Sequence, residues 1–173
     1  MTVNNIKSVA GVIFSQDRNS VLLVKRRDVP VWVLPGGGID RDESSENAVI
    51  REILEETGFT VKIDRLIALY LPTNKLAKAT HLYECLIENG SPQISSETLD
   101  IQFFPLDHLP KLIPPPFRDW IFDAHKMQPF FQKKIEGVTY PFLLLNLLRH
   151  PTLVLRFIYS KIKYKVIILV ANI

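Results

Sequence analysis

Cysteine is nearly absent from this chain of 173 residues, which contains only Cys85. A single cysteine excludes an intramolecular disulfide and a cysteine-based zinc site. Cys85 lies in the strand-like run 82–87, so we expect a buried structural thiol and not a nucleophile. The chain also lacks an apolar segment behind basic residues at its start, so we expect no signal peptide and a cytoplasmic location.

Acidic residues are missing from the last part of the sequence. From Gly137 onward there is no acidic residue, and the basic ones are Arg149, Arg156, Lys161, Lys163 and Lys165. Subtracting these five charges from the net charge of +3 leaves −2 for residues 1–136. The pI near 9.0 therefore reflects the end of the chain. No basic groove or reading helix is indicated, so we expect no nucleic-acid partner.

Long uncharged apolar runs are also missing, although residues 142–148 and 152–159 are strongly apolar. No stretch reaches the ~18 residues that a spanning helix needs. A polar stripe recurs at about helical spacing and comprises Asn146, Arg149, Arg156, Ser160 and Lys163. We therefore expect a domain at 1–136 and an apolar, basic, helical extension at 137–173. The extension either packs on the domain or on a second subunit, as in a homodimer, or lies on an anionic membrane surface.

Residues 37–59 carry the strongest pattern of the sequence, G-x5-E-x7-R-E-U-x-E-E-x-G-U, where U is a bulky apolar residue. Its fixed positions are Gly37, Glu43, Arg51, Glu52, Ile53, Glu55, Glu56, Gly58 and Phe59. At average residue usage, chance gives this pattern on the order of 10⁻¹⁰ times per starting position. The segment therefore carries chemical information beyond that of an ordinary acidic helix.

The spacing of the glutamates indicates a cation site. Glu52, Glu55 and Glu56 stand at i, i+3 and i+4, so a helix places them on one face, where like charges repel. Oxygen-rich sites of this kind suit Mg²⁺ or Mn²⁺. Ser44 or Ser45 can cap the start of this helix, and Gly58 can close its end. A solvated acidic face is the alternative for a glutamate pair alone.

A glycine-rich loop precedes the helix, at Pro35–Gly38. Glycine backbone can approach a metal ion or a phosphate closely, so we expect Gly37 and Gly38 to bind substrate. Arg51 lies beside Glu52 in sequence but on another part of the helical wheel. We expect it to orient Glu43 or a neighbouring loop through an ion pair.

The whole segment resembles the Nudix box, the defining motif of the Nudix hydrolase family. The resemblance implies an α/β/α sandwich with a mixed sheet. It also implies hydrolysis of nucleoside diphosphates linked to another moiety, with Mg²⁺ and with Mn²⁺ as substitute. By the same resemblance Glu55 and Glu56 are metal ligands, Glu52 is a ligand or the general base, and the Gly36 carbonyl is a further ligand.

The flanking residues support the resemblance. Lead-in residues 24–28 and the downstream segment 97–110 look like those of the family. In several members a downstream carboxylate reaches the metal or activates water, which makes Glu97 a second candidate base; a solvated loop glutamate is the alternative. Arg26 or Arg27 can contact phosphate, since guanidinium suits bidentate binding. The segment 97–110 leans towards ADP-ribose or CDP-alcohol hydrolases.

The order of apolar and polar runs agrees with this architecture. We expect a helix in the box, a second one at 118–126, and strands at 8–15, 21–26, 32–34, 61–71, 80–87 and 101–105. The first two strands are separated by a short polar turn and are predicted to form a hairpin.

Three functions compete at this point. The first is a metal-dependent pyrophosphohydrolase. The second is a Nudix-fold binding or regulatory module without turnover, although such modules usually lose box glutamates, and here all are present. The third is a diphosphate isomerase, for which Cys85 would be the only available thiol.

Overall fold

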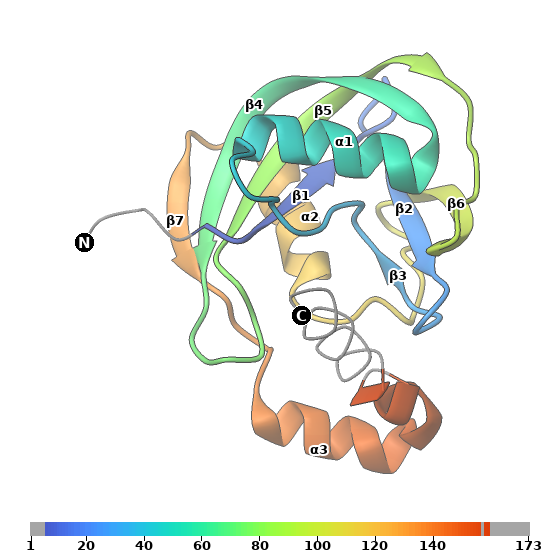
Figure 1. Ribbon diagram of the computed structural model, residues 1–173, viewed down its shortest axis with the longest axis vertical. Coiled ribbons are helices and arrows are strands. Elements are labelled where there is room, and N and C mark those ends of the chain that lie inside the picture. Colours follow the sequence, from blue (N-terminus) through green and yellow to red (C-terminus); the bar gives the residue numbers. More distant parts are fainter. Residues whose placement is uncertain (1–5, 157, 160–173) are drawn as a thin grey trace.

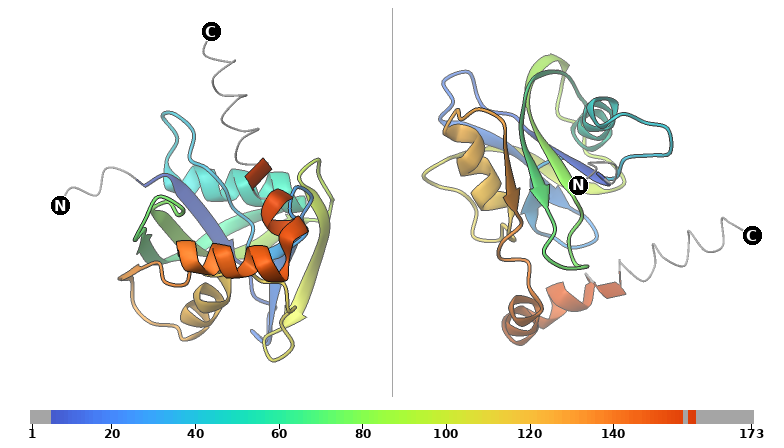
Figure 2. Two further views of the ribbon diagram at one scale, coloured as in Figure 1. Left: turned by 90° about the horizontal axis from the view of Figure 1, so that it is seen from below. Right: turned by 90° about the vertical axis from the view of Figure 1, so that its left-hand side faces the viewer.

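The structure is a computed structural model, and it describes residues 6–156 together with 158 and 159. Two sheets lie between helices α1 and α2, and helix α3 lies across one end of the molecule (Figures 1 and 2). In chain order the elements are β1 (Ser8–Val12), β2 (Ser20–Arg26), β3 (Trp32–Val33), α1 (Ser45–Thr57), β4 (Phe59–Leu71), β5 (Thr80–Gly90), β6 (Thr98–Pro105), α2 (Phe117–His125), β7 (Phe131–Lys134) and α3 (Tyr140–Arg149).

The strands form a mixed four-stranded sheet and an antiparallel three-stranded sheet. The first has the order β1-β5-β4-β7, in which β1 is parallel to β5 and β4 is parallel to β7. The second has the order β3-β2-β6. This arrangement confirms the expected α/β class with mixed strand directions.

Neighbouring residues of the same strands face opposite helices, because side chains alternate across a strand. Leu23 and Ala10 belong to the core cluster that packs beneath α2, with Trp120, Ile121 and Ala124. Leu22 and Val9 belong to the cluster beneath α1, with Ala48, Val49 and Ile53. The sheets therefore need an apolar helix face on both sides, which produces the sandwich.

The predicted hairpin between the first two strands forms at its turn end only. β1 pairs in parallel with β5, and β2 pairs with β3 and β6. Next to the turn, Phe14 and Val21 form an antiparallel bridge. The Ser15 N–H donates to the Ser20 carbonyl and the Leu22 N–H to the Ile13 carbonyl, each at 2.9 Å. Both runs are buried on two faces, and continuous apolar runs do not reveal which neighbour a strand will choose.

Strand β7 was not predicted from the sequence. It reads Phe-Gln-Lys-Lys, and three of its four residues are exposed. An edge strand needs no alternating apolar pattern, because only its backbone joins the sheet.

The extension is helical where the structure describes it, from Tyr140 to Arg149 and again from residue 151. Ser160 and Lys163 of the predicted polar stripe lie outside the described residues. Among the described residues, no helix is both long enough and apolar enough to cross a membrane.

Candidate active site

Helix α1 carries the predicted glutamates, and its ends are fixed by local chemistry. Of the two serines that could cap it, Ser44 does so: its side chain accepts a hydrogen bond from the Asn47 backbone N–H at 3.2 Å. Ser45 instead contacts the Tyr83 hydroxyl at 2.6 Å. Gly58 closes the helix with a left-handed backbone, φ 77°, which glycine adopts without steric cost. These caps set which residues of the helix face the sheets.

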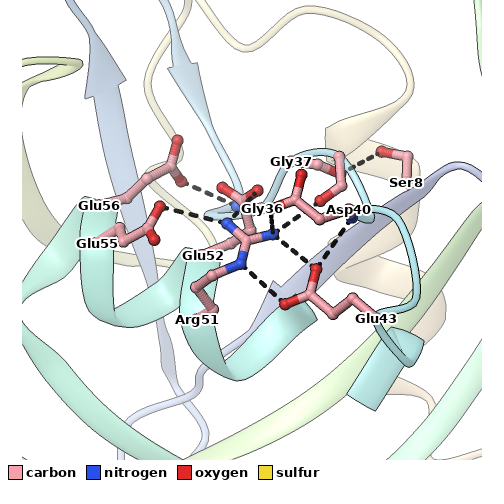
Figure 3. A network of polar contacts seen from close by, with 10 residues as sticks. Ser8, Gly36, Gly37, Asp40, Glu43, Arg51, Glu52, Glu55 and Glu56 are labelled. Atoms are coloured by element: carbon pink, nitrogen blue, oxygen red, sulfur yellow. Dashed lines mark hydrogen bonds and ion pairs between the residues drawn. The ribbon is translucent and has the colours of Figure 1, made fainter. Parts of the chain in front are cut away.

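The glycine loop is held against strand β1. The Gly37 carbonyl accepts hydrogen bonds from the Val9 backbone N–H at 3.0 Å and from the Ser8 hydroxyl at 2.9 Å (Figure 3). Gly36 has φ 150°, and a Cβ there would collide with the backbone of Val9 and Ala10. The loop can pass this close to the sheet only because position 36 has no side chain.

Arg51 is the centre of the polar network between the loop and the helix (Figure 3). Its Nε and Nη2 donate to the two oxygens of Glu43, each at 2.9 Å, which is the ion pair expected from the sequence. Its other contacts are Glu52 at 3.0 Å, Glu55 at 3.3 Å and the Gly38 carbonyl at 3.1 Å. The guanidinium lowers the pKa of Glu43 to about 2, mainly through these hydrogen bonds. Arg51 therefore positions the carboxylates and the loop relative to one another.

Two of the glutamates are withdrawn from water. Glu56 is 8% exposed and accepts a hydrogen bond from the Gly36 backbone N–H at 2.9 Å. Burial raises its pKa to about 7, with a further increase from the charge of Glu52. Burial also raises the pKa of Glu52, and Arg51 opposes this increase. Glu55, in contrast, has a side chain that is 58% exposed.

Glu97 and Arg26 lie near these carboxylates. The charge of Glu97 contributes to the raised pKa values of both Glu52 and Glu56, which places it in the same electrostatic environment. Arg26 is held in two hydrogen bonds by Asp28, at 2.9 and 2.7 Å, and this contact raises the pKa of its guanidinium. The charges of Glu56 and Glu97 raise the same pKa further. The structure thus brings one cation of the lead-in segment to the acidic cluster.

Arg27 is engaged elsewhere. Its Nη2 donates to the carbonyls of Thr98 at 3.0 Å and Ser95 at 3.3 Å. Its backbone N–H donates to the Glu97 carbonyl at 2.8 Å. Arg27 therefore holds the segment that carries Glu97, whereas sequence reasoning treated it as equivalent to Arg26.

Asp28 is a site residue whose importance the sequence analysis missed. The Arg-Arg-Asp order was visible at positions 26–28. This order does not reveal that Asp28 pairs with Arg26, whereas Arg27 binds backbone carbonyls. The pairing depends on how the chain bends after β2.

The chemistry of the donor set fits a divalent cation. Across the described part of the chain, no three His, Cys, Asp or Glu side chains are gathered into a ready-made metal cluster. The reason is visible in Figure 3: Arg51 draws Glu52 and Glu55 towards itself, and the Gly36 N–H holds Glu56. Burial and the charges of neighbouring carboxylates nevertheless disfavour the ionised forms of Glu52 and Glu56. A bound cation would offset that cost, and carboxylate oxygens are the ligands that Mg²⁺ prefers.

Comparison with known proteins places this geometry in a family. Residues 5–124 match the model of the NUDIX domain. A protein of Bacillus subtilis (strain 168), named as a candidate 8-oxo-dGTP diphosphatase, is 38% identical over 107 residues, which are 61% of this chain and 71% of that protein. An ADP-ribose pyrophosphatase of Methanocaldococcus jannaschii is 32% identical over 112 residues, which are 61% of this chain and 64% of that protein.

A solved structure agrees with these matches. The ADP-ribose pyrophosphatase of Streptococcus suis 89-1591 superposes with a TM-score of 0.61 at 28% identity. The match covers 73% of this chain and 97% of that one. The named relatives differ in substrate, while their names share the cleavage of a diphosphate.

Proposed function

This chain belongs to the Nudix hydrolase family, and from that premise we propose that it hydrolyses the pyrophosphate linkage of a nucleoside diphosphate joined to another moiety, with Mg²⁺ as cofactor. Mn²⁺ is the expected substitute, because it accepts the same oxygen ligands. Among substrates, the proposal favours the ADP-ribose or CDP-alcohol type. The relatives named as ADP-ribose pyrophosphatases support the first of these.

The observation that carries the proposal is the burial of Glu52 and Glu56 beside the glycine loop. Burial and neighbouring carboxylates raise the pKa values of both groups, which means that the fold disfavours their ionised forms. Perturbed groups of this kind cluster at functional sites. The Gly36 N–H points at one of them, and positions 36–38 of the loop carry no side chain that would block a phosphate. We assign Glu52, Glu55 and Glu56, with the Gly36 carbonyl, as the residues that would hold the cation.

When bound, the cation would neutralise diphosphate charge and make a water molecule more acidic. The side chains of the site position the reacting groups and transfer the proton. Arg51 keeps Glu52 and Glu43 in place, and Arg26 can neutralise charge on the substrate. Water attacks one phosphorus, a new P–O bond forms, and the bridging P–O bond breaks. A carboxylate takes the proton of the water, and two phosphorylated products leave.

Glu52 and Glu97 are the candidates for the general base. Glu52 is half-buried with a raised pKa, so it holds a proton more readily than a solvated carboxylate does. Glu97 is exposed and lies on the segment that Arg27 fixes. Replacing the true base by glutamine should lower kcat by about 10²–10⁴-fold and remove the acidic limb of the pH–rate profile. The other replacement should change KM or metal affinity more than kcat.

Turnover of defined substrates tests the proposal. The full chain is incubated with Mg²⁺ and ADP-ribose, CDP-choline, dinucleoside polyphosphates or nucleoside triphosphates, and products are identified by mass in ¹⁸O-labelled water. We expect cleavage of at least one diphosphate with one labelled product, and loss of cleavage when Mg²⁺ is chelated.

The triple change of Glu52, Glu55 and Glu56 to glutamine should abolish turnover. Glu46→Gln is the matched control, because Glu46 lies on the same helix but bonds to Ser45 and Tyr83. Undiminished cleavage by the triple variant would overturn the proposal. Mg²⁺ binding without turnover of any substrate would instead favour a non-catalytic nucleotide-binding or regulatory module.

A further inference from the structure

Helix α3 and the helical segment that begins at residue 151 expose many large apolar side chains. Leu148 is 77% exposed and Leu144 is 63% exposed. The apolar surface continues past Pro151 with Leu155, Ile158 and Tyr159, which are 59%, 45% and 68% exposed. Leu144 and Leu148 stand four residues apart, as do Leu155 and Tyr159, so each pair lies on one side of its helical segment. Exposed apolar surface gathered in this way marks an interaction site.

Helix α3 has a half-buried side and an exposed side, and both carry apolar residues. Asn146 is half-buried, and its side chain donates to the Phe142 carbonyl of its own helix at 2.9 Å. The leucines on the other side face solvent. No described residue of α3 belongs to either core cluster, whereas Val138, just before the helix, packs against one of them. One side of α3, with Phe142, Leu143 and Asn146, is therefore half-covered. The side with Leu144 and Leu148 is open to solvent.

The charge of the extension identifies what this open face would contact. Arg149 and Arg156 are exposed beside the leucines, and the sequence adds Lys161, Lys163 and Lys165 beyond the described residues. No acidic residue occurs after Glu136, and residues 1–136 are net negative. The extension thus combines exposed apolar side chains with basic charge that no acidic residue offsets. Its helix α3 lies at one end of the molecule (Figures 1 and 2).

We propose that residues 140–159 dock the protein on an anionic lipid surface. The leucine side chains would enter the boundary between head groups and acyl chains, and the arginines would contact lipid phosphates. The net negative charge of residues 1–136 would be repelled by the same surface, so the domain would be held with α3 towards the membrane. The contact is peripheral, in keeping with the absence of a spanning helix among the described residues.

A second copy of the chain is the less suitable occupant of this face. Joining two extensions would bring together Arg149 and Arg156 of both copies with no carboxylate in the segment to pair with them. Like charges across an interface disfavour association. An anionic membrane supplies both the apolar medium and the missing negative charge.

Vesicle flotation of the full-length chain tests the proposal. Vesicles of phosphatidylcholine mixed with phosphatidylserine should capture the protein, and vesicles of phosphatidylcholine alone should capture much less. Raising the salt concentration should release it. Arg149→Gln and Arg156→Gln should each weaken capture by about fivefold, and the pair L144E/L148E should weaken it by at least about tenfold.

Ile94→Glu is the matched control, because Ile94 is 65% exposed but lies outside the extension. It should bind vesicles as the unaltered protein does. The hydrolysis of a soluble substrate should stay unchanged in every variant, since none of these positions belongs to the candidate active site. The unfolding temperature should also stay unchanged, since the changed side chains are exposed. Equal capture of L144E/L148E and the unaltered chain would overturn the proposal. So would a stable dimer that L148E dissociates while anionic vesicles capture nothing.

Discussion

Gly37 lies where any side chain would displace Glu52. A Cβ built at this position collides with the carboxylate of Glu52, which is the flexible end of a side chain. At Gly38, by contrast, a Cβ meets nothing within 4 Å. Two adjacent glycines of one loop therefore differ in what they permit, although they look equivalent in the sequence.

We predict that Gly37→Ala lowers kcat by about a hundredfold with little change in stability, because a displacement of about 1 Å in a catalytic group has this effect. Steady-state kinetics and urea unfolding of the same variant separate the two properties. Gly38→Ala is the matched comparison and should lose much less activity. Equal losses in both variants would show that the glycines act through backbone freedom and not through space for Glu52.

The buried carboxylate of Glu56 makes a second prediction, about pH. Its pKa in the folded protein is about 7, against 4.5 for the ordinary group. A raised pKa means that the fold favours the protonated form, so the contribution to stability is present below about pH 4.5 and is lost as the pH rises through 7. The loss amounts to roughly 3 to 4 kcal/mol, since one pKa unit corresponds to ~1.4 kcal/mol.

This prediction is tested by urea unfolding in a chelator between pH 4.5 and 8. The free energy of unfolding of the unaltered protein should fall relative to that of Glu56→Gln, which cannot ionise. Adding Mg²⁺ at pH 8 should restore stability to the unaltered protein more than to the variant. Parallel pH profiles for the two proteins would contradict the role of Glu56.

At the scale of the element, helix α1 was the most predictable part of the chain. Its glutamate spacing, its apolar stripe and its closing glycine are local features, and each of them reappears in the structure. Only the choice between Ser44 and Ser45 as cap was left open. Tertiary structure decided it, because Tyr83 and His81 of β5 contact the Ser45 hydroxyl and leave Ser44 to the helix.

The strands were predictable as segments but not as partners. Each expected run contains a strand, yet β1 joins β5 across about seventy residues of sequence. Parallel pairing leaves no local signal, because no turn connects the two strands. The loop after β3 was predictable as glycine-rich, whereas its hydrogen bonds to Val9 and Ser8 depend on where β1 lies.

At the scale of the whole molecule, the boundary between domain and extension can be placed more finely than the sequence allowed. Val138 packs against the core beneath α2, and its carbonyl accepts a hydrogen bond from the Asn74 side chain at 2.7 Å. The N-cap of α3 is the next residue, Thr139. We therefore propose that the folded domain ends at Val138, two residues beyond the boundary expected from charge.

We predict that a chain ending at Val138 keeps both its unfolding temperature and its turnover of a soluble substrate. A chain ending at Glu136 should be less stable by roughly 1 kcal/mol, because it loses the apolar contact of Val138. Thermal unfolding followed by circular dichroism, together with activity, compares the two. Unfolding of both chains at ambient temperature would show that α3 is part of the folded core.

The sequence alone determined the helix that carries the glutamates, the flexible loop before it and the unequal distribution of charge, because these depend on neighbours within a few residues. The burial of Glu56, the hydrogen bond of Arg27 to the Thr98 carbonyl and the exposure of Leu148 were decided only by the tertiary structure. Each depends on whether residues that are distant in the sequence contact or cover the side chain. Water is excluded or admitted by the assembled fold, and the chemistry of a carboxylate or a leucine follows from that access.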